Sequence, residues 1–398
     1  MRVLRVRDPF HRSQLAIAAL FCSLGFQYAT WASRIPAIKE DLGLSAAEVG
    51  VLLMAAGIGA AVSFPLVAVL MRRLGSQRLA LLSALCLALL LLALAGAPNY
   101  PVALLVMCVD GVLVGCLNVA MNAQGAELEK RYERNAMARL HATFSGGSLL
   151  AALLASGMNA VTSAVAAHFG AAALFLLLLV VCARTGLLAE QQPADGAAEE
   201  SGAAQDAAPG KKKSKWTVPS RVTLWMCVAM AFGTVTEGAM NDWSALYLED
   251  VAEASAELAP LGIAVVSGMM VVARLFADGW RSRWGDGRVV LSGSVLAGAG
   301  LALALLSGGL VPALLGFACV GLGIAAVTPC VYVAAAGQGS DSLTLVAAMG
   351  TTGLLAGPPL IGFIAHASSL VWGLAAVAAS ALVVSACSTR IRWPATTG

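Results

Sequence analysis

Long uncharged apolar runs recur along the whole chain and limit what it can fold into. Leu79 to Ala97, which reads LALLSALCLALLLLALAGA, has 19 residues with one serine and no charge. A helix needs about 20 such residues to cross the roughly 30 Å hydrocarbon core of a bilayer. Charged residues make up only 12% of the 398 residues, whereas they make up about 25% of a soluble domain. The runs are too many for one aqueous core, so the sequence predicts an all-α polytopic membrane protein.

Twelve runs pass this test when single polar residues are tolerated within them. Six are expected at residues 13–34, 46–71, 78–97, 101–127, 138–160 and 162–184. Six more are expected at residues 221–248, 258–281, 288–308, 310–336, 342–366 and 369–388. Residues 185–220 separate the two sets and are hydrophilic, without apolar periodicity. This composition predicts a flexible cytoplasmic linker between one bundle at 1–184 and a second at 221–398.

Basic residues are distributed unequally between the predicted loops. The loops on one side hold 22 of the 25 Lys and Arg residues, whereas Arg34 and Lys39 fall on the other side and Arg274 within a span. Because Lys and Arg accumulate in cytoplasmic loops, both chain ends are predicted to be cytoplasmic, in a bacterial inner membrane. The KKKSK run at 211–215 suits an anchor at the lipid headgroups. The net charge of +3 offers no broad basic surface, so no nucleic-acid partner is expected.

A shift of 210 residues brings separate segments of the chain into register. It places residues 73–75, Arg-Leu-Gly, on residues 283–285, Arg-Trp-Gly, and it also places Gly111 on Gly321. One short match arises easily by chance in a chain rich in Ala, Gly and Leu, but two matches at the same offset do not. They predict two six-helix halves related by a pseudo-twofold axis along the membrane normal.

Several segments resemble major facilitator transporters. The string RLFADGWRSRWGDGR at 274–288 resembles the second-half copy of the family's loop motif. MRRLGSQR at 71–78 resembles the first-half copy, with Arg72 where the family has Asp. LVGCLNVAMNAQ at 113–124 and EGAMNDWSALYL at 237–248 are similar to the YbjJ-like branch, which includes the MosC type and is distantly similar to fucose permeases. The resemblance implies twelve helices in two six-helix bundles and secondary transport of a small polar, sugar-like or polyol-like solute.

The sequence contains no G-x-x-x-x-G-K-[ST] phosphate-binding loop, so a proton gradient and not ATP is expected to drive transport. The nine cysteines lie in predicted spans without a C-x-x-C pair, and no metal site is expected. No cofactor and no enzyme activity are predicted. The expected partners are a small polar solute and membrane lipid, and the chain is expected to be a monomer.

Ionisable residues inside a span need a partner or a water-filled cavity, because burying a charge there is costly. Asp110 is expected about 15 Å from the outer end of its helix and Glu237 about 24 Å from the inner end of its own. Burial raises the pKa of a carboxyl group, and a nearby Arg lowers it. A carboxyl group that alternates between these two settings can therefore take up and release a proton. Glu237, Asp110 and Asp242 are therefore the candidates for proton coupling.

Other charges suit a gate between two conformers. Arg274 and Asp278 lie four residues apart near the inner mouth and are predicted to pair. Arg283 belongs to the same loop motif, and Arg34 is a candidate partner of Asp110, with a purely structural tie as the alternative. His141 begins the predicted fifth helix as a gate or proton residue, or as an ordinary helix-end histidine.

In the family, helices 1, 4, 7 and 10 line the central cavity, and here each carries polar or aromatic side chains on a narrow face. Amides and hydroxyls beside aromatic rings suit a polyhydroxylated solute, and a carboxylate suits an amine. Two alternatives remain open: the asparagines on helix 4 hydrogen-bond between helices, and the tryptophans are interfacial anchors. The predicted substrate-binding residues are Gln27, Trp31, Asn118, Asn122, Glu237, Asn241, Trp243, Thr328 and Tyr332.

These features predict a proton-linked transporter that moves a sugar, a polyol or an amino-polyol such as a rhizopine-like compound by alternating access. A drug/H⁺ antiporter is the alternative, although helix 5, SGGSLLAALLASGM, lacks the proline of the drug-antiporter motif. A membrane receptor that keeps the fold without transporting is a third possibility.

Overall fold

The computed structural model describes residues 8–134, 136–188 and 219–393, apart from the side chains of Ala138, Asp278 and Ser340. Most of the predicted linker, the whole KKKSK run and the extreme ends of the chain therefore lie outside the described residues. Within the described residues the chain is built of helices joined by short turns, without strands.

The helices fall into two sets along the chain. The first set is α1 (Pro9–Ala32), α2 (Ile35–Leu42), α3 (Ala46–Ala95), α4 (Tyr100–Tyr132), α5 (Met137–Val161) and α6 (Val165–Ala183). The second set is α7 (Arg221–Asp250), α8 (Leu261–Trp284), α9 (Asp286–Ser307), α10 (Leu310–Ile324), α11 (Val327–Ala336), α12 (Ser340–Ala367) and α13 (Leu370–Ser388).

These helices provide twelve membrane passes. Ten helical segments of the described chain are long and apolar enough to cross a bilayer, with α10 and α11 counted together as one. α3 supplies two passes, because its 50 residues correspond to about 75 Å of helix at 1.5 Å per residue and the chain turns within it at Gly75. α8 adds the remaining pass through its apolar stretch Leu261–Ala277. The predicted twelve-helix all-α membrane fold is confirmed.

Local capping explains where the first helices begin. α1 starts before the predicted residue 13, because Asp8 accepts a hydrogen bond from the backbone N–H of Phe10 at 3.0 Å and Pro9 fits the first turn. The same backbone N–H lowers the pKa of the Asp8 carboxyl group. The short helix α2 was not predicted; it follows directly after α1 and ends at Gly43, whose φ is 63°.

Two matching glycines turn the chain at equivalent points of the two halves. Gly75 interrupts α3 with φ 73° and ψ 164°, and Gly285 separates α8 from α9 with φ 82° and ψ 152°. Glycine adopts this backbone conformation readily, because it has no Cβ. The two residues differ by the predicted offset of 210, so the sequence repeat recurs in the backbone.

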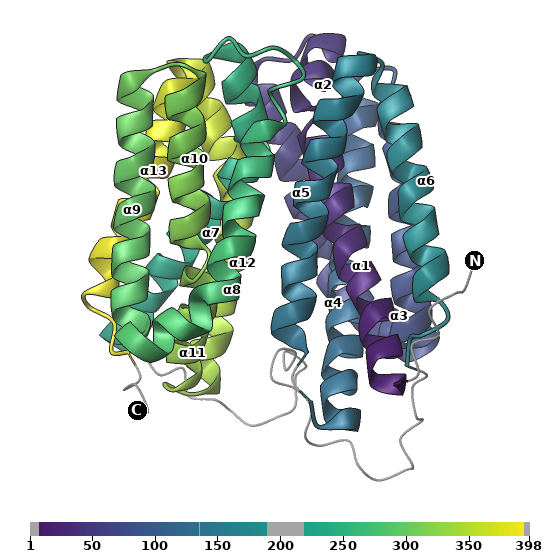
Figure 1. The fold of residues 1–398 in the computed structure, drawn as a ribbon, viewed down its shortest axis with the longest axis vertical. Helices are drawn as coiled ribbons and strands as arrows, with labels where there is room; N and C mark the ends of the chain where they lie inside the picture. The colour runs from purple at the N-terminus through teal and green to yellow at the C-terminus, as the bar shows by residue number, and fades with distance from the viewer. Residues whose placement is uncertain (1–7, 135, 189–218, 394–398) are drawn as a thin grey trace.

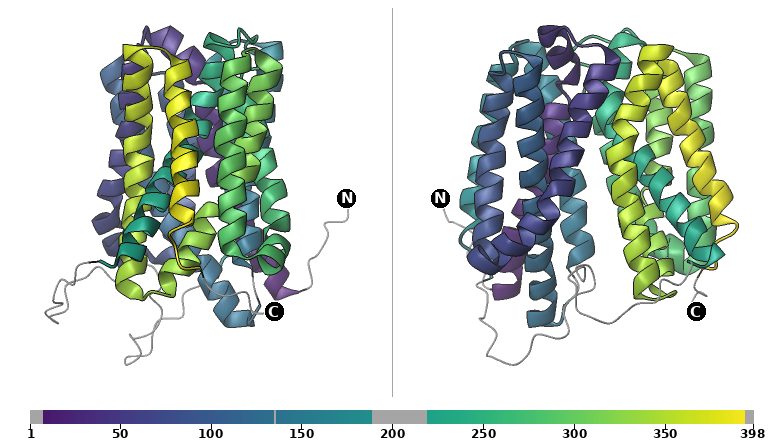
Figure 2. Two further views of the ribbon diagram at one scale, coloured as in Figure 1. Left: turned by 90° about the vertical axis from the view of Figure 1, so that its left-hand side faces the viewer. Right: turned by 180° about the vertical axis from the view of Figure 1, so that it is seen from behind.

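The helices form two bundles that stand side by side. α1–α6 make one bundle and α7–α13 the other, as the opposite views of Figures 1 and 2 show. Two helix pairs make most of the contact between the bundles: α3 with α12, and α5 with α8. Where α3 meets α12, a Cβ placed on Gly50 would lie 3.1 Å from the Cα of Gly362. The absence of side chains at these glycines lets the two helices approach closely.

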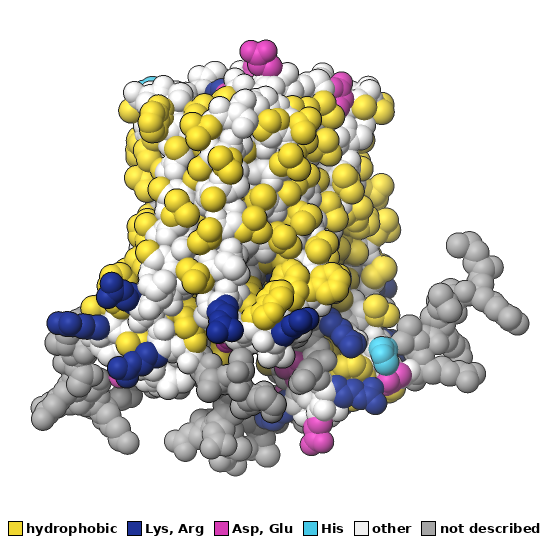
Figure 3. Space-filling view, turned by 60° about the vertical axis from the view of Figure 1, so that its left-hand side comes forward, with side chains coloured by type: hydrophobic (Ala, Val, Ile, Leu, Met, Phe, Trp, Pro, Cys, Tyr) yellow, Lys and Arg dark blue, Asp and Glu magenta, His cyan; other side chains and the backbone are white. Residues whose placement is uncertain are grey.

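The two ends of the molecule differ in charge. Basic side chains gather at one end, which is the lower end in Figure 3 and is called the basic end below. Its described basic residues are Arg12, Arg72, Arg73, Arg78, Lys130, Arg131, Arg134, Arg139, Arg184, Arg221, Arg281, Arg283, Arg288, Arg390 and Arg392. The opposite end, called the acidic end, carries Glu40, Asp41, Glu48, Glu249, Asp250, Glu253 and Glu257 beside Arg34 and Lys39.

Candidate functional site

An ion pair lies at mid-depth between the bundles. Arg274 of α8 places its Nη2 atom 3.3 Å from Oε1 of Glu237 on α7, and its Nη1 atom donates to the hydroxyl of Ser145 on α5 of the other bundle. Glu237 is about 24 Å from the basic end of α7, and Arg274 is about 15 Å from the basic end of α8. The side chains of Glu237 and Arg274 are 25% and 26% exposed. This pair, called the central ion pair below, is therefore only partly buried at membrane depth.

Asp242 connects the two bundles through a tyrosine. The hydroxyl of Tyr28 on α1 donates to Oδ1 of Asp242 on α7 at 2.5 Å. Asp242 is only 3% exposed. The Tyr28 ring packs edge-on against Trp31, with 4.9 Å between the ring centroids. A buried carboxyl group thus forms a direct hydrogen bond across the bundle interface.

Asp110 is held within its own bundle. Gln27, the neighbour of Tyr28 on α1, donates from Nε2 to Oδ1 of Asp110 at 2.6 Å. Both side chains are buried. One turn of α1 therefore supplies a neutral donor to each of two membrane-depth acids, Asp110 and Asp242. Among the described side chains, neither acid forms an ion pair.

The expected pairing of Arg34 with Asp110 is not formed. Arg34 lies in the turn between α1 and α2, about 10 Å beyond Gln27 along the helix axis. Its Nε donates to Nδ1 of His168 on α6 at 3.0 Å, and its Nη1 donates to the Ser163 carbonyl at 3.3 Å. Because its position lies beyond the end of α1, the guanidinium group binds α6 and the α5–α6 turn.

The predicted polar residues on α4, α7 and α11 lie on helix faces that are at least partly open. Asn118 is exposed, and Asn122 donates to its side-chain oxygen at 3.0 Å and to its carbonyl at 2.7 Å. Asn241 donates to the carbonyl of Glu237 at 3.0 Å, within its own helix. Thr328 and Tyr332 are half-buried on α11, which packs against α7.

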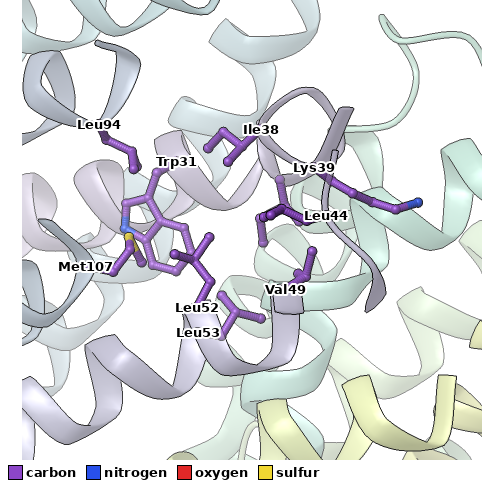
Figure 4. A pocket seen from close by; sticks show the side chains of 10 residues that line it. Trp31, Ile38, Lys39, Leu44, Val49, Leu52, Leu53, Leu94 and Met107 are labelled. Carbon is purple, nitrogen blue, oxygen red and sulfur yellow. The ribbon is translucent and has the colours of Figure 1, made fainter. Parts of the chain in front are cut away.

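The two predicted tryptophans are buried in apolar surroundings. Trp31 faces a narrow pocket between α1, α2, α3 and α4, lined by side chains that include Leu52, Leu94 and Met107 (Figure 4). The pocket has room for about one water molecule, about 10 Å³, and cannot hold a solute. Trp243 is fully buried in the core that joins α7 to its neighbours. In this conformer both tryptophans contribute packing.

The predicted gate residues lie in different parts of the structure. Arg274 belongs to the central ion pair, and its expected partner Asp278 has a side chain outside the described residues. His141 is exposed one turn from Ser145 and packs edge-on against Phe21, at 5.0 Å between centroids. Arg283 is exposed at the basic end of α8.

Hydrogen bonds and an ion pair close the space between the bundles at the acidic end. Lys39 of α2 pairs with Asp250 of α7. The hydroxyl of Ser156 donates to the Glu257 carbonyl, and Asn159 donates to the Ala256 carbonyl at 2.5 Å. These contacts form the acidic-end closure. The contact of Arg274 with Ser145 lies nearer the basic end than any of these contacts.

Sequence reasoning missed Tyr28, Ser145 and His168. Tyr28 directly follows the predicted Gln27, but it faces the other bundle and so falls outside the helix face that the spacing selected. Ser145 and His168 act as partners of predicted arginines. A long arginine side chain reaches neighbouring helices whose identity the sequence does not give.

Twelve membrane passes in two bundles, with ionisable side chains at membrane depth between them, define a membrane transporter fold. The chain matches the Major Facilitator Superfamily over residues 15–340 and belongs to this family of transporters.

Curated relatives cover nearly the whole chain. It is 31% identical over 391 residues to an uncharacterised MFS-type transporter of Yersinia pestis, covering 95% of this chain and 96% of the relative. An uncharacterised transporter of Sinorhizobium fredii is 32% identical over 358 residues, covering 89% of this chain and 91% of its own. The membrane protein MosC of Rhizobium meliloti is 29% identical over 378 residues, which cover 94% of this chain and 88% of MosC. The predicted likeness to the MosC type is confirmed.

Solved structures share the fold at low sequence identity. A variant of the nucleoside transporter NupG aligns with a TM-score of 0.73 and 15% identity, covering 96% of this chain and 99% of that one. Another NupG structure aligns with a TM-score of 0.70 and 14% identity, covering 96% of this chain and 98% of the NupG chain.

Proposed function

We propose that this transporter is proton-coupled and carries a small polar solute across the bacterial inner membrane, with its basic end in the cytoplasm. The proposed solute is a sugar, a polyol or an amino-polyol such as a rhizopine-like compound. The central ion pair is the observation that carries this proposal, because Glu237 and Arg274 are each about a quarter exposed at mid-depth. Charged groups that keep contact with water at such depth mark a path for a solute or an ion.

The chemistry of the pair supports a polar solute. Glu237 offers acceptor oxygens to hydroxyl groups and a negative charge to an amine, whereas Arg274 offers donors to hydroxyl or ring oxygens. The exposed amide of Asn118 adds a donor and an acceptor from α4 of the other bundle. A mostly apolar drug has few groups that can hydrogen-bond to these side chains, so the site favours a hydroxylated solute over a drug.

The acidic-end closure supports alternating access. Cross-bundle contacts extend from the central ion pair to the acidic end, which is the arrangement of a conformer closed toward one side of the membrane. Transport then requires these contacts to break while the bundles rock about the solute. Glu237 is the proposed proton carrier beside the solute, because proton and solute then sense each other's charge.

Proteoliposomes containing the purified chain test this function. Sugars, polyols, amino-polyols and nucleosides are first compared by the thermal stabilisation they give; nucleosides are included because the aligned NupG structures are of a nucleoside transporter. Uptake of the stabilising solute is then driven by a pH gradient. We expect Glu237→Gln to abolish accumulation but to retain counterflow, which needs no net proton movement. Glu40→Gln, the same chemical change on the exposed surface of α2, should behave as the parent.

Two results would contradict the proposal. Accumulation by Glu237→Gln equal to that of the parent would remove this residue from proton coupling. Stabilisation by apolar cations alone, with no polar solute active, would favour the drug/H⁺ antiporter.

A further inference from the structure

We propose that Asp242 is the group through which protonation controls the acidic-end closure, and that Tyr28 is the positioning residue that links it to the opposite bundle. This inference rests on the proposed proton-coupled function and adds a regulatory role at one of its carboxyl groups. It assigns to Tyr28 a function that its sequence position does not indicate.

The position of the contact supports this role. Tyr28 is four residues from the acidic end of α1 and Asp242 is eight residues from the acidic end of α7, so the hydrogen bond lies about 6–12 Å below the ends of these helices. Lys39 and Asp250 pair above it, and the central ion pair lies below it. The Tyr28–Asp242 bond therefore lies between the acidic-end closure and the central ion pair. Separation of the bundles at this end must break it and admit water to Asp242.

Burial determines which form of Asp242 favours closure. The carboxyl group is 3% exposed and has one neutral donor, the Tyr28 hydroxyl. A hydrogen bond to an ionised carboxylate is about twice as strong as one to a neutral group. Removing an unpaired carboxylate from water inside a membrane protein nevertheless costs more than this gain. Protonated Asp242 therefore stabilises the closed form, and loss of its proton favours opening toward the acidic end.

Other titratable groups surround this contact and must be separated from it. Glu237 on α7 and Asp110 on α4 are close enough to act electrostatically on the Tyr28 hydroxyl, as Asp242 does. Helices α10, α11 and α13 carry no Asp, Glu, Lys, Arg or His. The remaining Asp, Glu, Lys, Arg and His residues on or next to α7 and the helices packed against it are Asp8, His11, Arg12, Arg34, Lys39, Glu40, Asp41, Arg221, Glu249, Asp250, Arg274, Asp278, Arg281, Arg283, Asp341 and His366. The tyrosines and cysteines of these helices, apart from Tyr28, are Cys22, Cys227, Tyr247, Cys319, Cys330, Tyr332 and Cys387.

Pulsed electron paramagnetic resonance on the purified full chain measures the closure without any solute. Spin labels are attached through a genetically encoded ketone residue at Asp41 of α2 and Ala367 of α12, which leaves the nine cysteines unchanged. Both positions are exposed at the acidic end, one in each bundle. The populations of the short and long label distances are then followed from acidic to alkaline pH.

In the parent, we expect the long-distance population to rise with pH by up to about tenfold per unit, because opening is linked to the release of one proton. Asp242→Asn, which imitates the protonated form, should stay closed at every pH. Asp110→Asn should keep the rise with pH, because Asp110 is held within its own bundle by Gln27. A parent whose distances do not respond to pH, or an Asp242→Asn variant that still responds, would overturn the role of Asp242.

Tyr28→Phe tests the link between the bundles, because it keeps the ring against Trp31 and removes only the hydroxyl. It should raise the open population about fivefold to tenfold, the effect of one hydrogen bond. In an Asp242→Leu background the same change should have no effect, whereas Lys39→Gln should shift the population equally in both backgrounds. Equal effects of Tyr28→Phe in the two backgrounds would show that Tyr28 does not act through Asp242.

The two proposals can fail separately. Gradient-driven uptake that depends on Glu237, together with pH-independent label distances, would refute the role of Asp242 alone. A closure that responds to pH through Asp242, in a chain that accumulates no solute, would refute the proposed transport function alone.

Discussion

Gly111 and Gly321 hold equivalent positions in the two bundles, each pressed against a backbone carbonyl of a neighbouring helix. A Cβ on Gly111 would lie 1.8 Å from the carbonyl oxygen of Ala56, and a Cβ on Gly321 would lie 2.4 Å from that of Val266. Ala56 and Val266 differ by 210 residues, as do the glycines. The repeat therefore preserves a helix contact, α4 against α3 and α10 against α8, as well as a short sequence match.

Alanine at these glycines should destabilise the fold. Both Gly111→Ala and Gly321→Ala force a methyl group into a main-chain carbonyl, which can move only with its helix. We expect each to lower the free energy of unfolding by about 1–3 kcal/mol, the usual effect of overpacking, with a lower melting temperature in detergent.

Gly157→Ala on α5 and Gly170→Ala on α6 are the matched controls. A Cβ at either position meets no atom within 4 Å. Because Ala favours a helix over Gly, these variants should be neutral or slightly more stable. If all four variants melted alike, close approach of the helices would not explain Gly111 and Gly321.

The central ion pair should show strong coupling between its members. Arg274→Gln leaves Glu237 without its cation and should cost about 1–2 kcal/mol, less than the 3–5 kcal/mol of a fully buried pair, because both side chains are a quarter exposed. The double variant with Glu237→Gln should recover part of this loss. Thermal unfolding measures both effects, with Arg131→Gln at the basic end as a neutral control. Additive losses would show that the two residues act independently.

Gln27 and Asn118 should respond differently to truncation. Gln27→Ala leaves the buried carboxyl group of Asp110 without its donor and should lower stability by about 1–3 kcal/mol. Asn118 is exposed, so Asn118→Ala should leave the melting temperature unchanged and weaken solute binding by about tenfold. Calorimetric titration with the solute and melting curves on the same samples separate these effects. A stable Gln27→Ala variant with weakened binding would instead place Gln27 in the solute site.

His168 should carry its proton on Nε2. Arg34 donates from Nε to Nδ1 of His168, so this nitrogen must present its lone pair. Nitrogen-15 spectra of the histidine-labelled protein should show this neutral tautomer, assigned by its disappearance in His168→Gln. His168→Phe leaves the Nε of the buried Arg34 without its acceptor and should lower the melting temperature. A doubly protonated ring in the folded protein would contradict the observed hydrogen bond.

The sequence was sufficient to predict the membrane passes because each depends on the local apolar content of about 20 residues. The two passes of α3 were separated correctly at Arg72 to Arg78, where basic residues mark the end of a span. The short helix α2 was missed because its eight residues include Lys39, Glu40 and Asp41 and are too few and too polar to resemble a membrane span. The sequence also identified five of the six side chains in the Gln27–Asp110, Tyr28–Asp242 and Arg274–Glu237 contacts, all but Tyr28.

The side chains that contact each predicted residue were harder to predict than the position of that residue along its helix. The predicted pairing of Arg274 with Asp278 stays a prediction, because the Asp278 side chain lies outside the described residues, whereas the contacts of Arg274 with Glu237 on α7 and Ser145 on α5 were not predicted. Arg34 was matched to Asp110 by chemical type alone, and it binds His168, which lies 134 residues away. Such pairings depend on how helices rotate against each other, and a single sequence does not contain that rotation.

Two of the three contacts in the acidic-end closure rely on acceptors that every residue type supplies. Ser156 and Asn159 donate to the main-chain carbonyls of Glu257 and Ala256, so the loop between α7 and α8 needs its backbone path and not particular side chains. Substitutions at residues 256 and 257 can therefore accumulate during evolution without opening this side of the protein. Selection on the two donor positions of α5 should be correspondingly stricter, and relatives should vary in the loop while they retain donors on the helix.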